Sequence, residues 1–290
     1  MAERVGFIGL GIMGLPMAEN LAKGFSVMGF DTQESRLKGL ERVSPARAVA
    51  ELAAACSVVC LSLPSAAIVE AVTIGPEGLA AALKPGSLVV DLSTGLPTVS
   101  RRIAARLAEH GIEFADAPVS GGEAGARNAS LAIMVGATEA TFKRSLPYLS
   151  TIGGSVVRVG EVGAGGIAKL VNNMIVASTF TVIAEGFALA AKNGVEASAL
   201  YSAIHGGWAG SKVLDVSAEA IIARDYTPGG TIDMLEKDLG YARQLATESK
   251  VPIPMTAAAH EVFVAGQAAG RGKESQPAVI ELWRRLGGET

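Results

Sequence analysis

The sequence predicts an α/β protein with two domains, a doubly wound N-terminal domain followed by an all-α domain. Short apolar runs alternate with helical stretches up to residue 159, as in parallel sheets that are covered on both faces. After residue 163 the chain has long helical periods and no convincing strand pattern. Its 290 residues exceed the size of most single hydrophobic cores. We therefore expect domains at residues 1–162 and 163–290.

Short apolar runs predict the strands of the first domain. They cover residues 4–9, 25–30, 57–63, 87–91, 112–115, 131–135 and 156–159, with a helix expected at residues 14–23. In the second domain we expect helices at residues 165–193, 197–205, 213–223, 233–249 and 254–266, and a last one near the C-terminus. The longest of them has the length and apolar content of a helix that is buried among other helices.

Composition argues against several classes of protein. The net charge is −3 and there is no long basic run, which disfavours a nucleic-acid partner. The longest apolar stretch, residues 174–184, is shorter than a membrane span. The two cysteines, Cys56 and Cys60, share an apolar run and are interpreted as buried thiols, and the three histidines stand apart, so no metal site is predicted. We expect a soluble, cytoplasmic protein without a membrane or nucleic-acid partner.

A GxGxxG motif, GLGIMG, occupies residues 9–14, where a predicted strand ends and a predicted helix begins. Gly9 allows the tight turn, Gly11 lets the backbone approach a pyrophosphate, and Gly14 allows close packing of helix on strand. The helix N-terminus then offers N–H groups and a positive dipole end to the phosphates. We predict that a dinucleotide binds here, against Ile12 and Met13 as well.

The second strand ends at Asp31, 17 residues after Gly14. A carboxylate at this place accepts hydrogen bonds from a ribose 2′-hydroxyl and repels a 2′-phosphate, and the nearest cation in the sequence is Arg36. We therefore expect NAD rather than NADP as the cofactor. Leu63-Pro64 and Ser93-Thr94 follow the third and fourth predicted strands. These loops could wall a cofactor ribose or be ordinary turns, and the residues alone favour neither.

The loop DAPVSGG, residues 116–122, could hold a substrate carboxylate. Ser120 offers a hydroxyl, and Gly121 and Gly122 offer N–H groups that no side chain screens. An ordinary turn would also use these residues, because proline and paired glycines mark turns.

Lys169 lies on an otherwise apolar helix. Burying an ammonium group is costly unless it is paired. Asn173 is four residues on and shares its face, and Asn172 is three residues on. A lysine beside an amide can bind a carbonyl oxygen and give it a proton, although a surface lysine at a helix start fits the spacing equally well. Lys237, with acids on both sides, resembles an ordinary solvated helix face.

Taken together, these motifs resemble the β-hydroxyacid dehydrogenases over essentially the whole chain. The resemblance rests on residues 6–21 (GFIGLGIMGLPMAENL), 116–122 (DAPVSGG), 163–173 (GAGGIAKLVNN) and 237–239 (KDL). Residues 205–215 and 252–263 look most like tartronate semialdehyde reductases, also called 2-hydroxy-3-oxopropionate reductases. Residues 224–239 also look like L-threonate dehydrogenases.

The resemblance implies a Rossmann domain that binds NAD and a helical domain that also forms an oligomer interface, so we expect a homo-oligomer. It implies that Lys169 is the catalytic lysine, with Asn173 at a substrate-side position, and that residues 120–122 bind the carboxylate of a small substrate. Thr94 and Lys237 match residues that contact the cofactor. One departure is local: the family usually has Gly-Thr where this chain has Ala129-Ser130.

Three functions compete at this point. The first is an NAD-dependent dehydrogenase that interconverts a small 3-hydroxy acid and its aldehyde or ketone, with tartronate semialdehyde, L-threonate and 3-hydroxyisobutyrate as candidate substrates. The second is an imine reductase, a related class that typically carries a different residue at the lysine position. The third is a non-catalytic dinucleotide-binding module. Lys169 and the intact carboxylate loop argue for the first.

Overall fold

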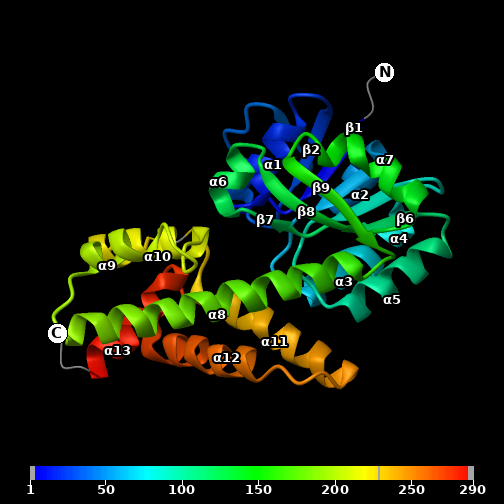
Figure 1. Cartoon of the computed structure of the whole chain (residues 1–290). Coiled ribbons are helices and arrows are strands. Elements are labelled where there is room, and N and C mark those ends of the chain that lie inside the picture. Colours follow the sequence, from blue (N-terminus) through cyan, green and yellow to red (C-terminus); the bar gives the residue numbers. More distant parts are fainter. Residues whose placement is uncertain (1–3, 228, 287–290) are drawn as a thin grey trace. The chain divides into compact units, whose positions relative to one another are not determined.

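A computed structural model describes residues 4–227 and 229–286, and it divides the chain into two compact units, Met1–Lys169 and Leu170–Thr290 (Figure 1). The division falls inside helix α8 (Ala164–Lys192). The expected domain limits, 1–162 and 163–290, stay a prediction. The two units are described here one at a time.

The first unit is built on one nine-stranded sheet. Its hydrogen-bonded order is β3-β2-β1-β4-β5-β6-β8-β7, with β9 paired to β8. The strands are β1 (Arg4–Ile8), β2 (Ser26–Phe30), β3 (Val43–Pro45), β4 (Val58–Leu61), β5 (Leu88–Asp91), β6 (Glu113–Asp116), β7 (Val119–Ser120), β8 (Leu131–Gly136) and β9 (Gly153–Gly160). The first six are parallel, and the fold class that the sequence predicts is confirmed.

The sheet differs from the expected parallel sheet at one end. β8 runs antiparallel to β6 and β7, and the sequence did not predict β3 or β7. The helix before β8, α6 (Gly122–Arg127), has six residues and rises only about 9 Å. It is too short to carry the chain back along the sheet, so β8 starts from the edge where β6 ended.

Helices cover both faces of this sheet, and the side chains of β1 alternate between two cores. Val5 and Phe7 join one apolar cluster, and Ile8 joins the other. The remaining helices of the first unit are α1 (Gly14–Leu21), α2 (Val49–Ala55), α3 (Ala66–Ile74), α4 (Leu79–Ala82), α5 (Pro97–Ala108) and α7 (Glu139–Leu149). Cys60 lies in the first cluster and Cys56 in the second. Both are buried and unbridged, and burial raises the pKa of Cys56 to about 11 and of Cys60 to about 12.

The second unit is helical in the part that the structure describes. Besides α8 it contains α9 (Ala197–Ile204), α10 (Lys212–Ala223), α11 (Ile232–Ser249), α12 (Pro254–Gly266) and α13 (Ile280–Leu286). Its core joins Phe180 and Phe187 of α8 to Leu214 of α10, Leu239 of α11 and Phe263 of α12. Figure 1 shows α8 in green along α11, α12 and α13, with α9 and α10 on its other side. The helices expected from the sequence are present within one or two residues of their limits.

Candidate active site

The segments that follow four strands of the first unit lie at one edge of its sheet. Gly9, Leu63 and Thr94 lie in the loops after β1, β4 and β5, and Ser120 lies in the short strand β7 that follows β6. The strands β1, β4, β5 and β6 are parallel neighbours. β1 has β2 on one side and β4 on the other, so the strand order reverses there. Doubly wound sheets bind ligands at the carboxyl ends of their strands, beside such a reversal. The edge therefore collects residues of the first unit that the sequence predicts for the cofactor, and Ser120, which it predicts for the substrate carboxylate.

The GxGxxG turn has the tight packing that its glycines predict. Gly9 has φ +94°, and a Cβ on it would lie 2.2 Å from the Ser62 carbonyl oxygen. A Cβ on Gly14 would lie 1.8 Å from the Gly9 carbonyl oxygen, whereas the nearest atom to a Cβ on Gly11 is 3.6 Å away. No side chain caps α1 through a hydrogen bond, and Ile12 is 61% exposed. This turn fits a pyrophosphate, because its helix N-terminus faces no side-chain acceptor of its own.

Asp31 organises the end of the expected adenosine site. Its carboxylate accepts hydrogen bonds from the Leu10 and Gln33 N–H groups, both at 2.8 Å. It also pairs with the Arg36 guanidinium, Nη1 to Oδ2 at 3.1 Å. Burial raises the pKa of Asp31, but these hydrogen bonds and Arg36 outweigh it and leave the pKa below its ordinary value. Asp31 is therefore ionised, and the guanidinium of Arg36, five residues later in the sequence, lies beside it.

The loops after β4 and β5 are joined by a hydrogen bond. The Leu63 N–H donates to the Ser93 hydroxyl at 2.9 Å, and the Ser93 N–H donates to Asp91 Oδ1 at 2.9 Å. Asp91 is buried, and burial raises its pKa to about 7, although the bonds from Ser93 oppose this. Leu63-Pro64 and Ser93-Thr94 thus form one connected wall, held by a carboxyl group at the end of β5.

The end of β6 is tied to the start of α8. Asp116 accepts hydrogen bonds from the Gly163 N–H at 2.7 Å and from the Gly166 N–H at 2.8 Å. Lys169 follows Gly166 by three residues and is half-buried. Residues 117–122, which the sequence predicts as a loop, follow β6 directly but include the short strand β7 (Val119–Ser120) and the first residue of α6, with Gly121 at φ +137° and Gly122 at φ +62°. The first unit therefore connects the predicted carboxylate loop with the helix turn that carries the predicted catalytic lysine.

A second cluster of polar side chains lies within the helical unit. The Asn173 amide donates to Asp238 Oδ2 at 2.7 Å, and the Asn172 amide donates to Asn173 Oδ1 at 2.9 Å. Lys237 Nζ lies 2.9 Å from Asp238 Oδ1 and 5.1 Å from the centre of the Tyr241 ring. Asp238 is buried. It brings Asn173 and Lys237 together, two residues that the sequence predicts for different parts of the site.

Sequence reasoning missed the carboxyl groups that hold these side chains. Asp91, Asp116 and Asp238 are each less than 7% exposed. An acid that ends an apolar strand is a signal for Asp91 and Asp116, because a charge there needs local partners. Asp238 has no such signal, since its neighbours suggest a solvated helix face. Among the described residues no group of three potential metal ligands comes together.

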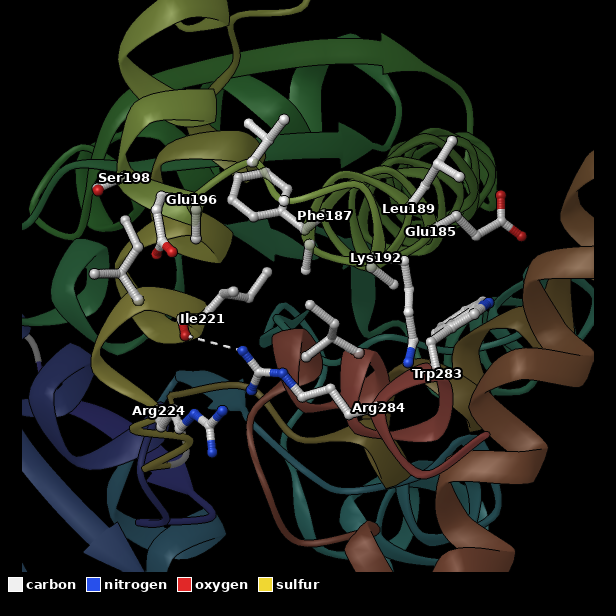
Figure 2. Close-up of a pocket in the computed structure, with 17 residues that line it drawn as sticks. Glu185, Phe187, Leu189, Lys192, Glu196, Ser198, Ile221, Arg224, Trp283 and Arg284 are labelled. Atoms are coloured by element: carbon white, nitrogen blue, oxygen red, sulfur yellow. Dashed lines mark hydrogen bonds between the residues drawn. The ribbon is translucent and has the colours of Figure 1, made fainter. Parts of the chain in front are cut away.

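The helical unit also contains a pocket of about 640 Å³. Figure 2 shows Phe187, Ile221 and Trp283 around it, with Arg284 extending toward Ile221. The Arg284 guanidinium donates a 3.4 Å hydrogen bond to the Ile221 carbonyl oxygen. None of the predicted site residues lines this pocket. This pocket is therefore separate from the predicted site.

Comparisons with known proteins place these features in a family. Residues 4–160 match the family described as the NAD binding domain of 6-phosphogluconate dehydrogenase. Residues 163–283 match the one described as NAD-binding of NADP-dependent 3-hydroxyisobutyrate dehydrogenase.

Three relatives are similar over nearly their whole length. The chain is 39% identical to 2-(hydroxymethyl)glutarate dehydrogenase of Eubacterium barkeri, covering 98% of this chain and 96% of the relative. It is 36% identical to 2-hydroxy-3-oxopropionate reductase of Escherichia coli, covering 96% of both. Among solved structures, Mycobacterium tuberculosis 3-hydroxyisobutyrate dehydrogenase with L-serine has a TM-score of 0.89 at 33% identity, covering 98% of this chain and 100% of that one.

Proposed function

Because this chain belongs to the β-hydroxyacid dehydrogenase family, we propose that it interconverts a small 3-hydroxy acid and its semialdehyde or ketone, with Lys169 as the general acid and base. The protein is an NAD-dependent oxidoreductase that acts on CH–OH groups. The observation that supports the proposal most directly is the tie between β6 and α8. Through Asp116 it joins the carboxylate loop to the turn before Lys169.

The cofactor site is proposed at the edge of the sheet. Gly9, Gly11 and Gly14, with the N–H groups of Ile12 and Met13, would hold the pyrophosphate. Asp31 would accept from the ribose, and Leu63-Pro64, Thr94 and Lys237 would line the rest. Bound NAD supplies a hydride acceptor, and its reduced form a hydride donor.

The chain's own residues would supply binding and proton transfer. The Ser120 hydroxyl and the Gly121 and Gly122 N–H groups would hold the substrate carboxylate. In the reductive direction negative charge grows on the carbonyl oxygen, and the Lys169 ammonium would donate its proton there. In the oxidative direction the neutral amine would accept it back. Asn173, one helical turn from Lys169, and Asn172 would hold the substrate oxygens.

The substrate itself is proposed at the level of a class. Tartronate semialdehyde is the first candidate, and L-threonate and 3-hydroxyisobutyrate are the alternatives. The 39% identical relative is named for 2-(hydroxymethyl)glutarate, which is also a 3-hydroxy acid but carries a second carboxylate. These candidates differ by small substituents, which a pocket residue or two can discriminate.

One experiment tests the class and the lysine together. Each candidate acid or semialdehyde is offered with NAD or NADH, and the absorbance of the reduced cofactor is followed. Lys169→Ala should lower kcat on the best substrate by about 10²- to 10⁴-fold and leave NADH affinity nearly unchanged. Lys169→Arg should not restore activity, because a guanidinium does not release its proton near neutral pH. A near-normal kcat in Lys169→Ala would refute the assignment, and turnover of no substrate would favour a non-catalytic binding module.

We also propose that the chain forms a homo-oligomer through its helical unit. α8 is long and apolar enough to cross a membrane by length and composition, and only 28% of its apolar window is buried. Ile175, Val182 and Leu189 recur every seven residues on it and are 64%, 59% and 68% exposed. A heptad stripe of this kind is typical of helices that pack against a second helix. A second copy of this chain would cover it, and the buried free thiols agree with a cytoplasmic location.

A further inference from the structure

Asp116 caps α8 from a distant strand. The first N–H groups of a helix have no acceptor within the helix. The N–H group of Gly166, in the first turn of α8, donates to Asp116 Oδ2, and the N–H group of Gly163, directly before α8, donates to Asp116 Oδ1, across 50 and 47 residues of sequence. Asp116 is 2% exposed. A carboxylate at a helix N-terminus is also favoured by the helix dipole, so this contact is both a double hydrogen bond and a charge interaction.

Glycines make room for this contact. A Cβ on Gly165 would lie 2.4 Å from the Met134 carbonyl oxygen and 2.5 Å from the Asp116 carbonyl oxygen. A Cβ on Gly136 would lie 2.5 Å from Asp116 Oδ1. The first turn of α8 is therefore pressed against the ends of β6 and β8, and any side chain at these two glycines would displace it.

The contact of Asp116 with α8 affects the distance between Lys169 and the segment that would hold the substrate carboxylate. Lys169 stands in the turn after Gly166, and the loop 117–122 begins at the residue after Asp116. We infer that Asp116 is a positioning residue. By holding the start of α8 it fixes the position of Lys169 relative to the segment that would hold the substrate carboxylate. The inference rests on the proposed function, since it gives Lys169 its task. Asp116 itself takes no part in the transfer of hydride or proton to the substrate.

The two hydrogen bonds to Asp116 depend on its charge state and therefore on pH. Burial raises its pKa to about 6, opposed by the hydrogen bonds from Gly163 and Gly166 and by Arg101. The charged or titratable groups facing it are Asp91, its cross-strand neighbour on β5, and Arg101 of α5, whose Nε would lie 2.9 Å from a Cβ on Gly163. Above pH ~6 both oxygens accept. Below it, one oxygen carries a proton and can no longer accept from an N–H group in the same way.

Asp116→Asn is the direct test, because the amide keeps one acceptor and turns a donor toward the other N–H group. We expect kcat in the reductive direction to fall by about 10- to 100-fold, the scale for a small misplacement of a catalytic group. NADH affinity should stay within about twofold of the wild-type value. The wild-type kcat should also decline below pH ~6, and this acid limb should be missing in Asp116→Asn.

Amide hydrogen exchange reports the contact without any activity. Exchange at Gly163 and Gly166 should be roughly tenfold faster or more in Asp116→Asn. Asp91→Asn, which removes a neighbouring buried carboxylate without a bond to α8, is the matched control and should leave their exchange as in wild type. If Asp116→Asn does not fold, the wild-type protein provides the test. Its exchange at these two amides, corrected for intrinsic rates, should quicken as the pH falls from 7 to 5.

Three results would overturn the inference: a wild-type kcat in Asp116→Asn, equal loosening of α8 in Asp91→Asn, or exchange at Gly163 and Gly166 that does not depend on Asp116 or on pH. A Lys169→Ala enzyme at full rate would instead sink the proposed function, and the exchange result would then stand by itself as evidence of the cap.

Discussion

At the scale of single residues, Asp31 serves two purposes. Its carboxylate would meet the cofactor ribose, and it already holds the Leu10 and Gln33 N–H groups and pairs with Arg36. A 2′-phosphate would meet a negative charge at this place. Arg36, which is partly exposed, would offset only part of that repulsion, since it is bound to the same carboxylate.

We therefore expect NADH to be used about 100-fold more efficiently than NADPH, because close like charges cost several kcal/mol and about 1.4 kcal/mol equals a factor of ten. Asp31→Asn combined with Thr32→Arg should reverse much of this ratio, measured as kcat/KM with each cofactor. Arg36→Gln is the control and should keep the preference for NADH. A wild-type enzyme that is more efficient with NADPH would show that Asp31 does not select the cofactor.

At the scale of elements, the strand–turn–helix unit of β1 and α1 separates two uses of glycine. Gly14 is needed for packing, since its Cβ would overlap the Gly9 carbonyl oxygen. Gly11 has ordinary space around it in the protein alone. In the proposed site its lack of a side chain would let a pyrophosphate approach the backbone.

Gly14→Ala should destabilise the fold by at least about 1–3 kcal/mol, as overpacking does. Gly11→Ala should unfold within about 0.5 kcal/mol of the wild-type protein but bind NADH at least roughly tenfold more weakly. Denaturant unfolding and a fluorescence titration with NADH measure the two effects. The assignment fails if Gly11→Ala binds NADH normally or if Gly14→Ala is as stable as wild type.

The turn between α6 and β8 contains a strained residue. Ala129 has φ +53°, a conformation that costs an L-residue about 1–2 kcal/mol. It stands where the family usually has glycine, so the departure that the sequence shows lies at the position where glycine is the better residue. The turn is still closed by a 2.9 Å hydrogen bond from the Ser130 N–H to the Gly125 carbonyl.

Ala129→Gly should stabilise the protein by about 1 kcal/mol and raise Tm by roughly 2–4 °C. Ala124→Gly on the neighbouring helix α6 should have the opposite sign, because glycine weakens a helix. Calorimetry of the two variants compares them directly. Equal shifts of Tm in the same direction would contradict a strained backbone at Ala129.

At the scale of the whole molecule, the exposed stripe on α8 needs an explanation, since monomeric proteins rarely leave such a surface open. Ile175, Val182 and Leu189 belong to the same helix whose other side builds the core of the second unit. An oligomer would bury the stripe.

Val182→Glu with Leu189→Glu should weaken self-association by roughly 30-fold or more, the effect of losing about 2 kcal/mol at an interface. Light scattering over a dilution series measures this. Val157→Glu, on β9 of the other unit and 52% exposed, should leave the oligomer intact. A protein that is monomeric before any substitution would remove the basis of this proposal.

The buried carboxyl groups make stability depend on pH. Burial raises the pKa of Asp91 from 3.8 to about 7, so the folded state binds this proton more tightly than the unfolded state. The resulting stabilisation is fully present below pH ~4 and is lost as the pH rises to about 7. Asn at this position can still accept from the Ser93 N–H without titrating.

The free energy of unfolding of wild type relative to Asp91→Asn should therefore fall by up to about 1.4 kcal/mol per pH unit between pH 5 and 7. Urea titrations at several pH values measure it. Asp233→Asn is the control: its hydrogen bond to Lys273 lowers the pKa of Asp233, so this group stays ionised across the interval. A difference between wild type and Asp91→Asn that is flat with pH would contradict the raised pKa.

By itself, the sequence determined seven strands of the first unit, the helices of the second unit, the GxGxxG turn, and the fact that its candidate loops follow strand ends. Periodicity and turn chemistry act over a few residues, and parallel strands necessarily end at one edge, so these features need no distant information. The same reasoning identified the helix that carries Lys169.

Only the tertiary structure decided which distant groups meet. Asp116 reaches backbone N–H groups 47 residues and more along the chain, and Asp238 reaches the amide of Asn173 across 65 residues. The reversed direction of β8 and the left-handed Ala129 followed from a helix too short to cross the sheet and from the turn that closes behind it. The physical reason is that a buried polar group is satisfied by whichever partner comes within about 3 Å, and no local pattern encodes that partner.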